Sequence, residues 1–91
     1  MTEFKTAKKI DASTAPALDK KLKGLIADGE MELVVDMSET TYISSVGLRA
    51  FASAQKKINA AGGSMVLRHA QPGVIDIFEV TGFGGVLTFE Q

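Results

Sequence analysis

Cysteine is absent from this chain of 91 residues, and His69 is its only histidine. Without cysteine the chain can form neither disulfide bonds nor thiolate metal sites, which fits a reducing compartment. No apolar run approaches the roughly 20 residues that cross a bilayer, and the opening MTEFKTAKKI lacks the apolar block of a signal peptide. These absences predict a cytoplasmic protein without membrane insertion.

A strong net charge is also missing, because 10 basic residues nearly balance 11 acidic ones. Residues 1–24 hold six lysines and three acids, but the lysines alternate with acids and only Phe4 accompanies them. This pattern is typical of a solvated helix face, so we expect no nucleic-acid partner. The 45% apolar content predicts one globular domain over residues 1–91, with a single core and a site at its surface.

Metal and cofactor motifs are lacking as well. Asp11, Asp36 and Asp76 show no ligand spacing, and the glycine-rich GFGG (82–85) is not followed by G-K-[ST]. We therefore expect no metal, no cofactor and no catalytic residues. A hydrolase built from Ser44 or Ser45 with His69 is the least favoured alternative, because no G-x-S-x-G segment is present.

The chain does contain a regular alternation of strand and helix patterns. Strands are expected at 3–10, 32–37, 64–68 and 86–89. Helices are expected to start within DASTAP, to run from after Gly47 to Gly62-Gly63, and to run from Pro72 to Gly82. The alternation predicts an α/β fold, with a mixed, largely parallel sheet of four to five strands and about three helices. Apolar residues at 33–35 predict a central strand that helices cover on at least part of each side.

Three segments are expected at the same edge of this sheet. In a parallel sheet the strand-to-helix junctions lie at the carboxyl ends of the strands, where sites usually form. DAST (11–14), ISSVG (43–47) and RHAQP (68–72) are such junctions, and they converge if the first strand runs parallel to the others.

The serine pair at positions 44 and 45 has two compatible uses at a helix entry. As an N-cap, one hydroxyl would accept a hydrogen bond from a first-turn amide and stabilise the helix by about 1 kcal/mol. Capping does not account for the second serine, or for Arg49 close behind it. The other use is phosphorylation, since free amides and the helix dipole can accept the added charge without unfolding the protein.

Four segments in order resemble the STAS domain (sulphate transporter and anti-sigma factor antagonist), most closely the stand-alone bacterial anti-anti-sigma factors. They are DASTAPAL, LVVDMSETTYISSVGLRAF, AGGSMVL and PGVIDIFEVTGF. The resemblance implies a STAS-like fold and a protein that binds an anti-sigma factor, commonly a serine kinase, and so releases a sigma factor. Phosphorylation switches such proteins off, and a phosphatase is a further expected partner. The kinase supplies the ATP, so the chain itself is not expected to be an enzyme.

The resemblance also implies which residues act. The phosphoacceptor lies two places before the motif glycine, which here makes it Ser45. Ser44 stands where well-characterised phosphorylated members carry aspartate, and Val46 replaces a usual serine or alanine. The expected partner-binding residues are Asp11, Thr14, Ser44, Val46, Gly47 and Arg49.

Compared with the family pattern, the first hairpin is shortened and the usual final helix is absent after Gln91. A bare flank of the core would favour a homo-oligomer or a larger complex. A second hypothesis follows from Ser44 in place of aspartate. In it the chain is a constitutive STAS scaffold subunit of a lipid-transport or sensory complex, and the serines only cap the helix.

Overall fold

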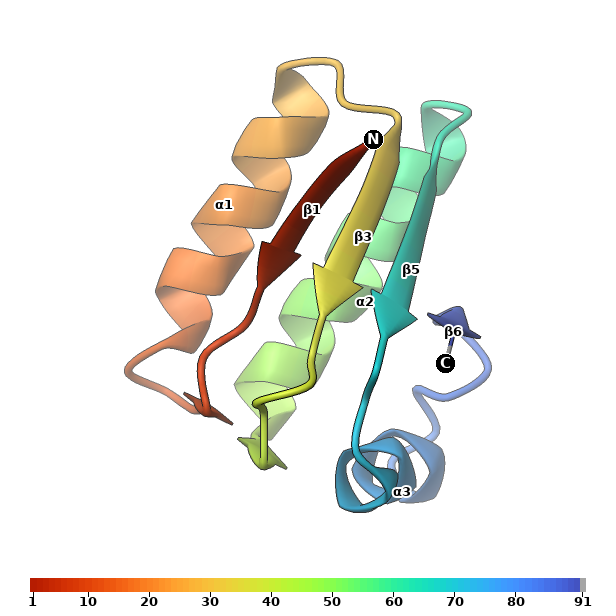
Figure 1. The fold of residues 1–91 in the computed structure, drawn as a ribbon. Coiled ribbons are helices and arrows are strands. Elements are labelled where there is room, and N and C mark those ends of the chain that lie inside the picture. Colours follow the sequence, from red (N-terminus) through yellow and green to blue (C-terminus); the bar gives the residue numbers. More distant parts are fainter. Residues whose placement is uncertain (91) are drawn as a thin grey trace.

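The computed structural model describes residues 1–90, in which a four-stranded sheet packs against two long helices (Figure 1). In spatial order the strands are β1 (Thr2–Lys5), β3 (Glu32–Asp36), β5 (Ser64–Arg68) and β6 (Phe89–Glu90). Each neighbouring pair is parallel, and so is a second small sheet of β2 (Lys9–Ile10) and β4 (Tyr42–Ile43). The predicted α/β fold is confirmed, and the first strand runs parallel to its neighbour, which is the condition for convergence of the three junctions.

The three helices are α1 (Ala15–Ala27), α2 (Ser45–Ala60) and α3 (Pro72–Val80). Proline lies in the first turn of α1 and of α3, where a helix has no use for the missing N–H. Past the end of α2, Gly62 has a φ of +86° and its N–H donates to the carbonyl of Asn59, which confirms the predicted glycine stop. Within residues 1–90, none of the helices combines the length and the apolar character that crossing a bilayer requires.

The core lies between the sheet and the two long helices. Strands β3 and β5 direct alternate apolar side chains toward them, and Phe51 of α2 and Phe78 of α3 are fully buried against this layer. The strand residues on this face are Leu33, Val35, Met65 and Leu67, each at most 1% exposed. Helix packing on this side holds the starts of α1 and α2 at one end of the molecule.

The opposite face of the sheet differs from the prediction. Figure 1 shows α1 and α2 behind the same face and α3 beyond the carboxyl end of β5, so no helix of residues 1–90 covers the face that carries Val34 and Val66. Val34 is nevertheless only 5% exposed, at the centre of the sheet between its strand neighbours. The expectation of helices on part of each face is therefore wrong. Residues 33–35 are all apolar because Val34, on the uncovered face, is buried by its neighbours in the sheet.

The first predicted strand, 3–10, is divided in the structure. It forms β1 and β2 with a turn between them, where Thr6 is buried and its hydroxyl shares a hydrogen bond with that of Thr40. This turn lets β2 leave the main sheet and pair with β4. The last predicted strand, 86–89, is displaced to Phe89–Glu90.

Candidate functional site

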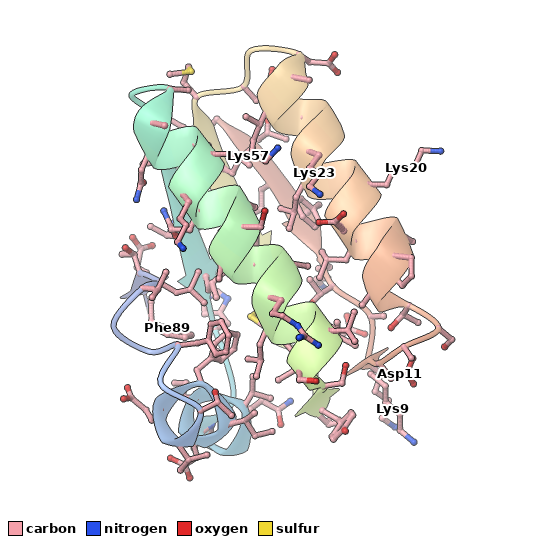
Figure 2. The ribbon with its side chains drawn as sticks, turned by 180° about the vertical axis from the view of Figure 1, so that it is seen from behind. Lys9, Asp11, Lys20, Lys23, Lys57 and Phe89 are labelled. Carbon is pink, nitrogen blue, oxygen red and sulfur yellow. The ribbon has the colours of Figure 1, made fainter. Side chains whose placement is uncertain are left out.

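The small β2–β4 sheet joins two of the predicted junctions. Ile10 of β2 and Ile43 of β4 are in register, and the N–H of Ser44 donates to the carbonyl of Ile10 at 2.8 Å. Since α1 and α2 begin shortly after these strands, their first turns lie at the same end of the molecule. In Figure 2, Lys9 and Asp11 mark this end next to the start of α1. The expected convergence of 11–14 with 43–47 is thus observed.

Ser45 is the first residue of α2, and its side chain is exposed to solvent. No acceptor within residues 1–90 takes the N–H groups of Ser45, Val46 or Gly47, so the first turn of α2 has unpaired donors. Val46 is 41% exposed, and Arg49 is exposed one helical turn after Ser45. Ser45 is therefore an accessible hydroxyl beside unpaired amides and a cation.

Ser44 has a different environment from its neighbour. It is the N-cap of α2 by backbone geometry, with φ of −90° and ψ of 171°, and its carbonyl accepts the N–H of Leu48 at 3.0 Å. Its hydroxyl is buried, caps no amide and has no hydrogen-bond partner in residues 1–90. The capping hydrogen bond considered from the sequence is not formed.

Gly47 was expected at the docking edge, but it is buried under it. A Cβ atom at this position would lie 2.6 Å from Cγ2 of Ile10 and 2.9 Å from Cγ1 of Ile43, closer than real Cβ contacts allow. Only glycine lets the first turn of α2 pack this tightly on the β2–β4 sheet. Gly47 supports the position of Ser45 from the inside and is not itself available to a partner.

Asp11 and Thr14 hold the turn that precedes α1. The Asp11 carboxylate accepts hydrogen bonds from the Ser13 hydroxyl at 2.7 Å and the Ser13 N–H at 2.9 Å. The Thr14 hydroxyl accepts the N–H of Asp11 and donates to the carbonyl of Lys9. The hydrogen bonds from Ser13 lower the pKa of Asp11 below its usual value. Both side chains are half-buried, and their local bonds fix the shape of the edge beside Ser45.

A groove between α1 and α2 begins next to Ser45 and has a volume of about 420 Å³. An ion pair of 3.0 Å joins Asp19 to Lys23 along its α1 side, and Arg49 lies on its α2 side. In Figure 2, Lys23 lies on the side of α1 that faces α2, whereas Lys20 points away from it. The lining residues are Ala15, Pro16, Asp19, Lys23, Val46, Arg49, Ala50 and Ser53.

Sequence reasoning missed the α1 side of this groove. The four-residue spacing of positions 15, 19 and 23 places them on one stripe of α1, and this stripe is the signal that could have found them. The stripe alone does not say what α1 faces. That depends on how the two helices pack.

The third junction, 68–72, lies at the same edge, but it contacts residues 36–38 instead of the other two junctions. The Gln71 side-chain amide donates to the carbonyl of Ser38 at 2.9 Å, and Nδ1 of His69 is 3.7 Å from the Asp36 carboxylate. Hydrogen bonds from Ser38, with a smaller effect of His69, lower the pKa of Asp36. Because no hydrogen bond joins His69 to either serine, the Ser–His pair that a hydrolase would need is not formed in residues 1–90.

The family model described as the STAS domain matches residues 2–91. The protein BtrV of Bordetella bronchiseptica is 32% identical over 74 residues, a match that covers 81% of this chain and 64% of BtrV. The anti-sigma-B factor antagonist of Bacillus subtilis is 31% identical over 81 residues, covering 89% of this chain and 73% of that protein. The match to BtrV therefore spans just under two thirds of the length of BtrV.

Solved structures agree on the fold. The anti-sigma factor antagonist SpoIIAA in its unphosphorylated form matches with a TM-score of 0.82 at 15% identity, over 99% of this chain and 80% of that one. SpoIIAA of Bacillus in the phosphorylated form matches with a TM-score of 0.76 over 99% of this chain and 83% of that one, also at 15% identity. At this identity the likeness concerns the fold alone.

Proposed function

Because this chain belongs to the STAS domain family, we propose that it is an anti-sigma factor antagonist controlled by phosphorylation of Ser45. In this proposal the chain is a cytoplasmic STAS domain that binds an anti-sigma factor, so that the sigma factor is released. It acts by binding, and a partner kinase carries out the chemistry. The relative from Bacillus subtilis, named an anti-sigma-B factor antagonist, supports the binding part of this proposal.

The observation that carries the proposal is the position of Ser45. Its hydroxyl is exposed at the first residue of α2, where a kinase can reach it. The unpaired N–H groups of the first turn and the positive end of the helix dipole favour a negative charge there. Arg49, four residues on, gives a phosphate a second favourable neighbour. Adding phosphate to Ser45 is therefore compatible with the fold.

The partner surface in this proposal surrounds Ser45. Val46 and Arg49 supply exposed apolar and basic contacts, and the α1–α2 groove continues the surface away from Ser45. Asp11 and Thr14 shape the adjoining turn. A phosphate dianion at the centre of this surface must lose water when a partner docks, so we expect phosphorylation to weaken binding by about a hundredfold or more.

The scaffold hypothesis gives the serines a capping role only. The Ser44 hydroxyl caps no amide. Ser45 is the first helical residue and not the N-cap, and its side chain is exposed. Neither serine therefore acts as that hypothesis requires, although the lack of an acidic residue at position 44 still distinguishes this chain from the phosphorylated family pattern.

The proposal is tested with an anti-sigma factor kinase from the source organism, ATP and Mg²⁺. Mass spectrometry should find one phosphate on the wild type and on Ser44→Ala, which removes only the buried hydroxyl, and none on Ser45→Ala. Peptide mapping should assign the phosphate to Ser45. If a kinase binds the wild type but leaves it unmodified, the proposed control by phosphorylation is wrong. Phosphate on Ser44 would mean that the phosphorylated residue is Ser44 and not Ser45.

A further inference from the structure

Positive charge is concentrated on the two long helices. Together α1 and α2 carry six of the ten basic residues of the chain and one of its eleven acidic residues, whereas the rest of the chain carries four basic and ten acidic residues. All six basic residues of the two helices are exposed. Since α1 and α2 lie on the same face of the sheet (Figure 1), they form a basic layer in a chain whose net charge is −1.

Three cations of this layer lie along the α1–α2 groove. Lys23 of α1 and Arg49 of α2 line the groove itself. Lys57 follows Ser53, another lining residue, by four positions and so lies on the same stripe of α2. In Figure 2, Lys57 lies on the side of α2 that faces α1, and Lys23 lies on the side of α1 that faces α2. The groove therefore has cations on both of its helices.

Two of these three cations have no acidic neighbour. Lys23 forms its ion pair of 3.0 Å with Asp19. No carboxylate of residues 1–90 lies within ion-pair distance of Arg49 or Lys57. Their charges face solvent, where they attract a partner of opposite charge and speed its docking.

The floor of the groove is apolar. Ala15 and Ala50 are buried there, and Pro16 and Val46 are exposed beside them. Apolar side chains of a protein gain free energy by packing on such a floor, whereas a nucleic acid presents phosphates and sugars to it. None of the lining residues described in 1–90 is aromatic, so bases have no ring to stack on. The groove therefore fits a protein surface better than a nucleic acid.

From the unpaired cations, the apolar floor and the position of the groove next to Ser45, we propose, on the premise of the proposed function, that the anti-sigma factor docks an acidic segment there. Its carboxylates contact Arg49 and Lys57, which are eight residues or about 12 Å apart along α2. Its apolar side chains pack on the floor between the two helices. The groove is lined by residues of α1 and α2 alone, so the docking surface is formed by these two helices.

An acidic segment gives a physical reason for release by phosphorylation. The phosphate and the segment are both negative, and both are attracted to Arg49, which lies one helical turn after Ser45. A phosphate on Ser45 therefore repels the segment and competes with it for Arg49. The loss of affinity on phosphorylation should be smaller at high salt, where this repulsion is screened.

The test measures the association and dissociation rates of the anti-sigma factor from the source organism with two charge-reversal variants. Lys57→Glu changes the groove, whereas Lys20→Glu makes the same change of charge on a side of α1 that points away from α2. We expect Lys57→Glu to weaken binding at least tenfold, mainly through slower association, and Lys20→Glu to weaken it less than threefold. High salt should slow association of the wild type and reduce the difference between the variants.

The outcomes separate this docking mode from the proposed function. Failure of the wild type to bind the anti-sigma factor would reject the proposed function, and the acidic docking with it. Equal affinities of the wild type and Lys57→Glu, or an association rate that salt leaves unchanged, would reject the acidic docking alone. Self-association or retention on duplex DNA that Lys57→Glu abolishes would show instead that a second copy or a nucleic acid occupies the groove.

Discussion

Two neighbouring serines in this protein have opposite surroundings. Ser45 opens α2 with an exposed hydroxyl, whereas the hydroxyl of Ser44 is buried without a hydrogen-bond partner in residues 1–90. A buried polar group without a partner destabilises a fold, while an exposed one at a helix start is free to react. The two hydroxyls should therefore respond differently to the same substitution.

Replacing Ser44 by alanine tests this difference. An N-cap serine that bonds a first-turn amide loses about 1 kcal/mol of stability in this substitution. Because the Ser44 hydroxyl makes no such bond, we expect Ser44→Ala to change the free energy of unfolding by less than about 0.5 kcal/mol, or to raise it. Urea unfolding followed by circular dichroism measures this. A loss of about 1 kcal/mol or more would mean that the hydroxyl does cap α2.

Gly47 gives the opposite expectation. An added Cβ would collide with Ile10 and Ile43, so we expect Gly47→Ala to destabilise the protein by about 1–3 kcal/mol. Gly24→Ala is the matched control, because Gly24 lies in α1 with nothing within 4 Å of an added Cβ. That change should stabilise by about 0.5–1 kcal/mol through helix propensity. Equal effects in both variants would contradict the tight contact at Gly47.

At the scale of elements, the turn before α1 connects stability to pH. Hydrogen bonds from Ser13 lower the pKa of Asp11 in the folded state, so the ionised carboxylate stabilises the fold above the ordinary aspartate pKa near 4. This contribution disappears as pH falls through the lowered pKa. We expect the Asp11→Asn protein to lose less stability than the wild type between pH 5 and about 2.

The measurement is the midpoint of thermal unfolding at a series of pH values. Asp76→Asn is the comparison variant, because it also removes one aspartate carboxylate, in α3 and away from the turn before α1. If the unfolding midpoint falls equally steeply below pH 5 in Asp11→Asn and in the wild type, the Ser13 hydrogen bonds do not stabilise the ionised Asp11 carboxylate.

The first turn of α2 makes a further prediction at this scale. Its unpaired amides and the helix dipole favour a negative charge at the first helical position, so Ser45→Asp should stabilise the protein by about 0.3–1 kcal/mol. The effect should shrink at high salt, since the site is exposed. Chemical unfolding at low and high salt measures it. A destabilised variant would mean that the fold resists charge at this position, against the proposed switch.

Local sequence signals predicted most of the elements. Proline marked the starts of α1 and α3, Gly62 the end of α2, and apolar runs the strands β3 and β5. The division of the first strand was not predicted, because it depends on a hydroxyl contact between Thr6 and the distant Thr40. The uncovered face of the sheet was not predicted either. A strand buried by its neighbours in the sheet has the same run of apolar residues as a strand covered by helices.

The same distinction applies to the site. Strand order brought 11–14 and 43–47 together as expected, because topology follows from the alternation of elements. The buried hydroxyl of Ser44, the packing role of Gly47 and the α1–α2 groove depend on side-chain rotamers and on how closely the helices approach. One-dimensional patterns do not contain that information.

On the scale of the whole molecule, the structure separates two surfaces. The starts of α1 and α2 present Ser45, Arg49 and the α1–α2 groove, whereas a second groove, lined by Phe4, Leu18 and Lys21 among others, lies between β1 and α1. The turn at Ser13 and Thr14 lies between them and lines the β1 groove. We expect a phosphate on Ser45 to alter binding at the first surface and to leave the second and the fold as they are.

The central claim is that a phosphate at Ser45 changes which proteins dock while the fold is retained. The most direct test measures the dissociation constant of the anti-sigma factor for the unmodified and the Ser45-phosphorylated protein by calorimetry, with amide NMR spectra of both forms. The account predicts binding at least about a hundredfold weaker after phosphorylation, or about 2.8 kcal/mol, with spectral changes confined to the starts of α1 and α2. Equal affinities, or a spectrum that changes throughout the sheet, would contradict it.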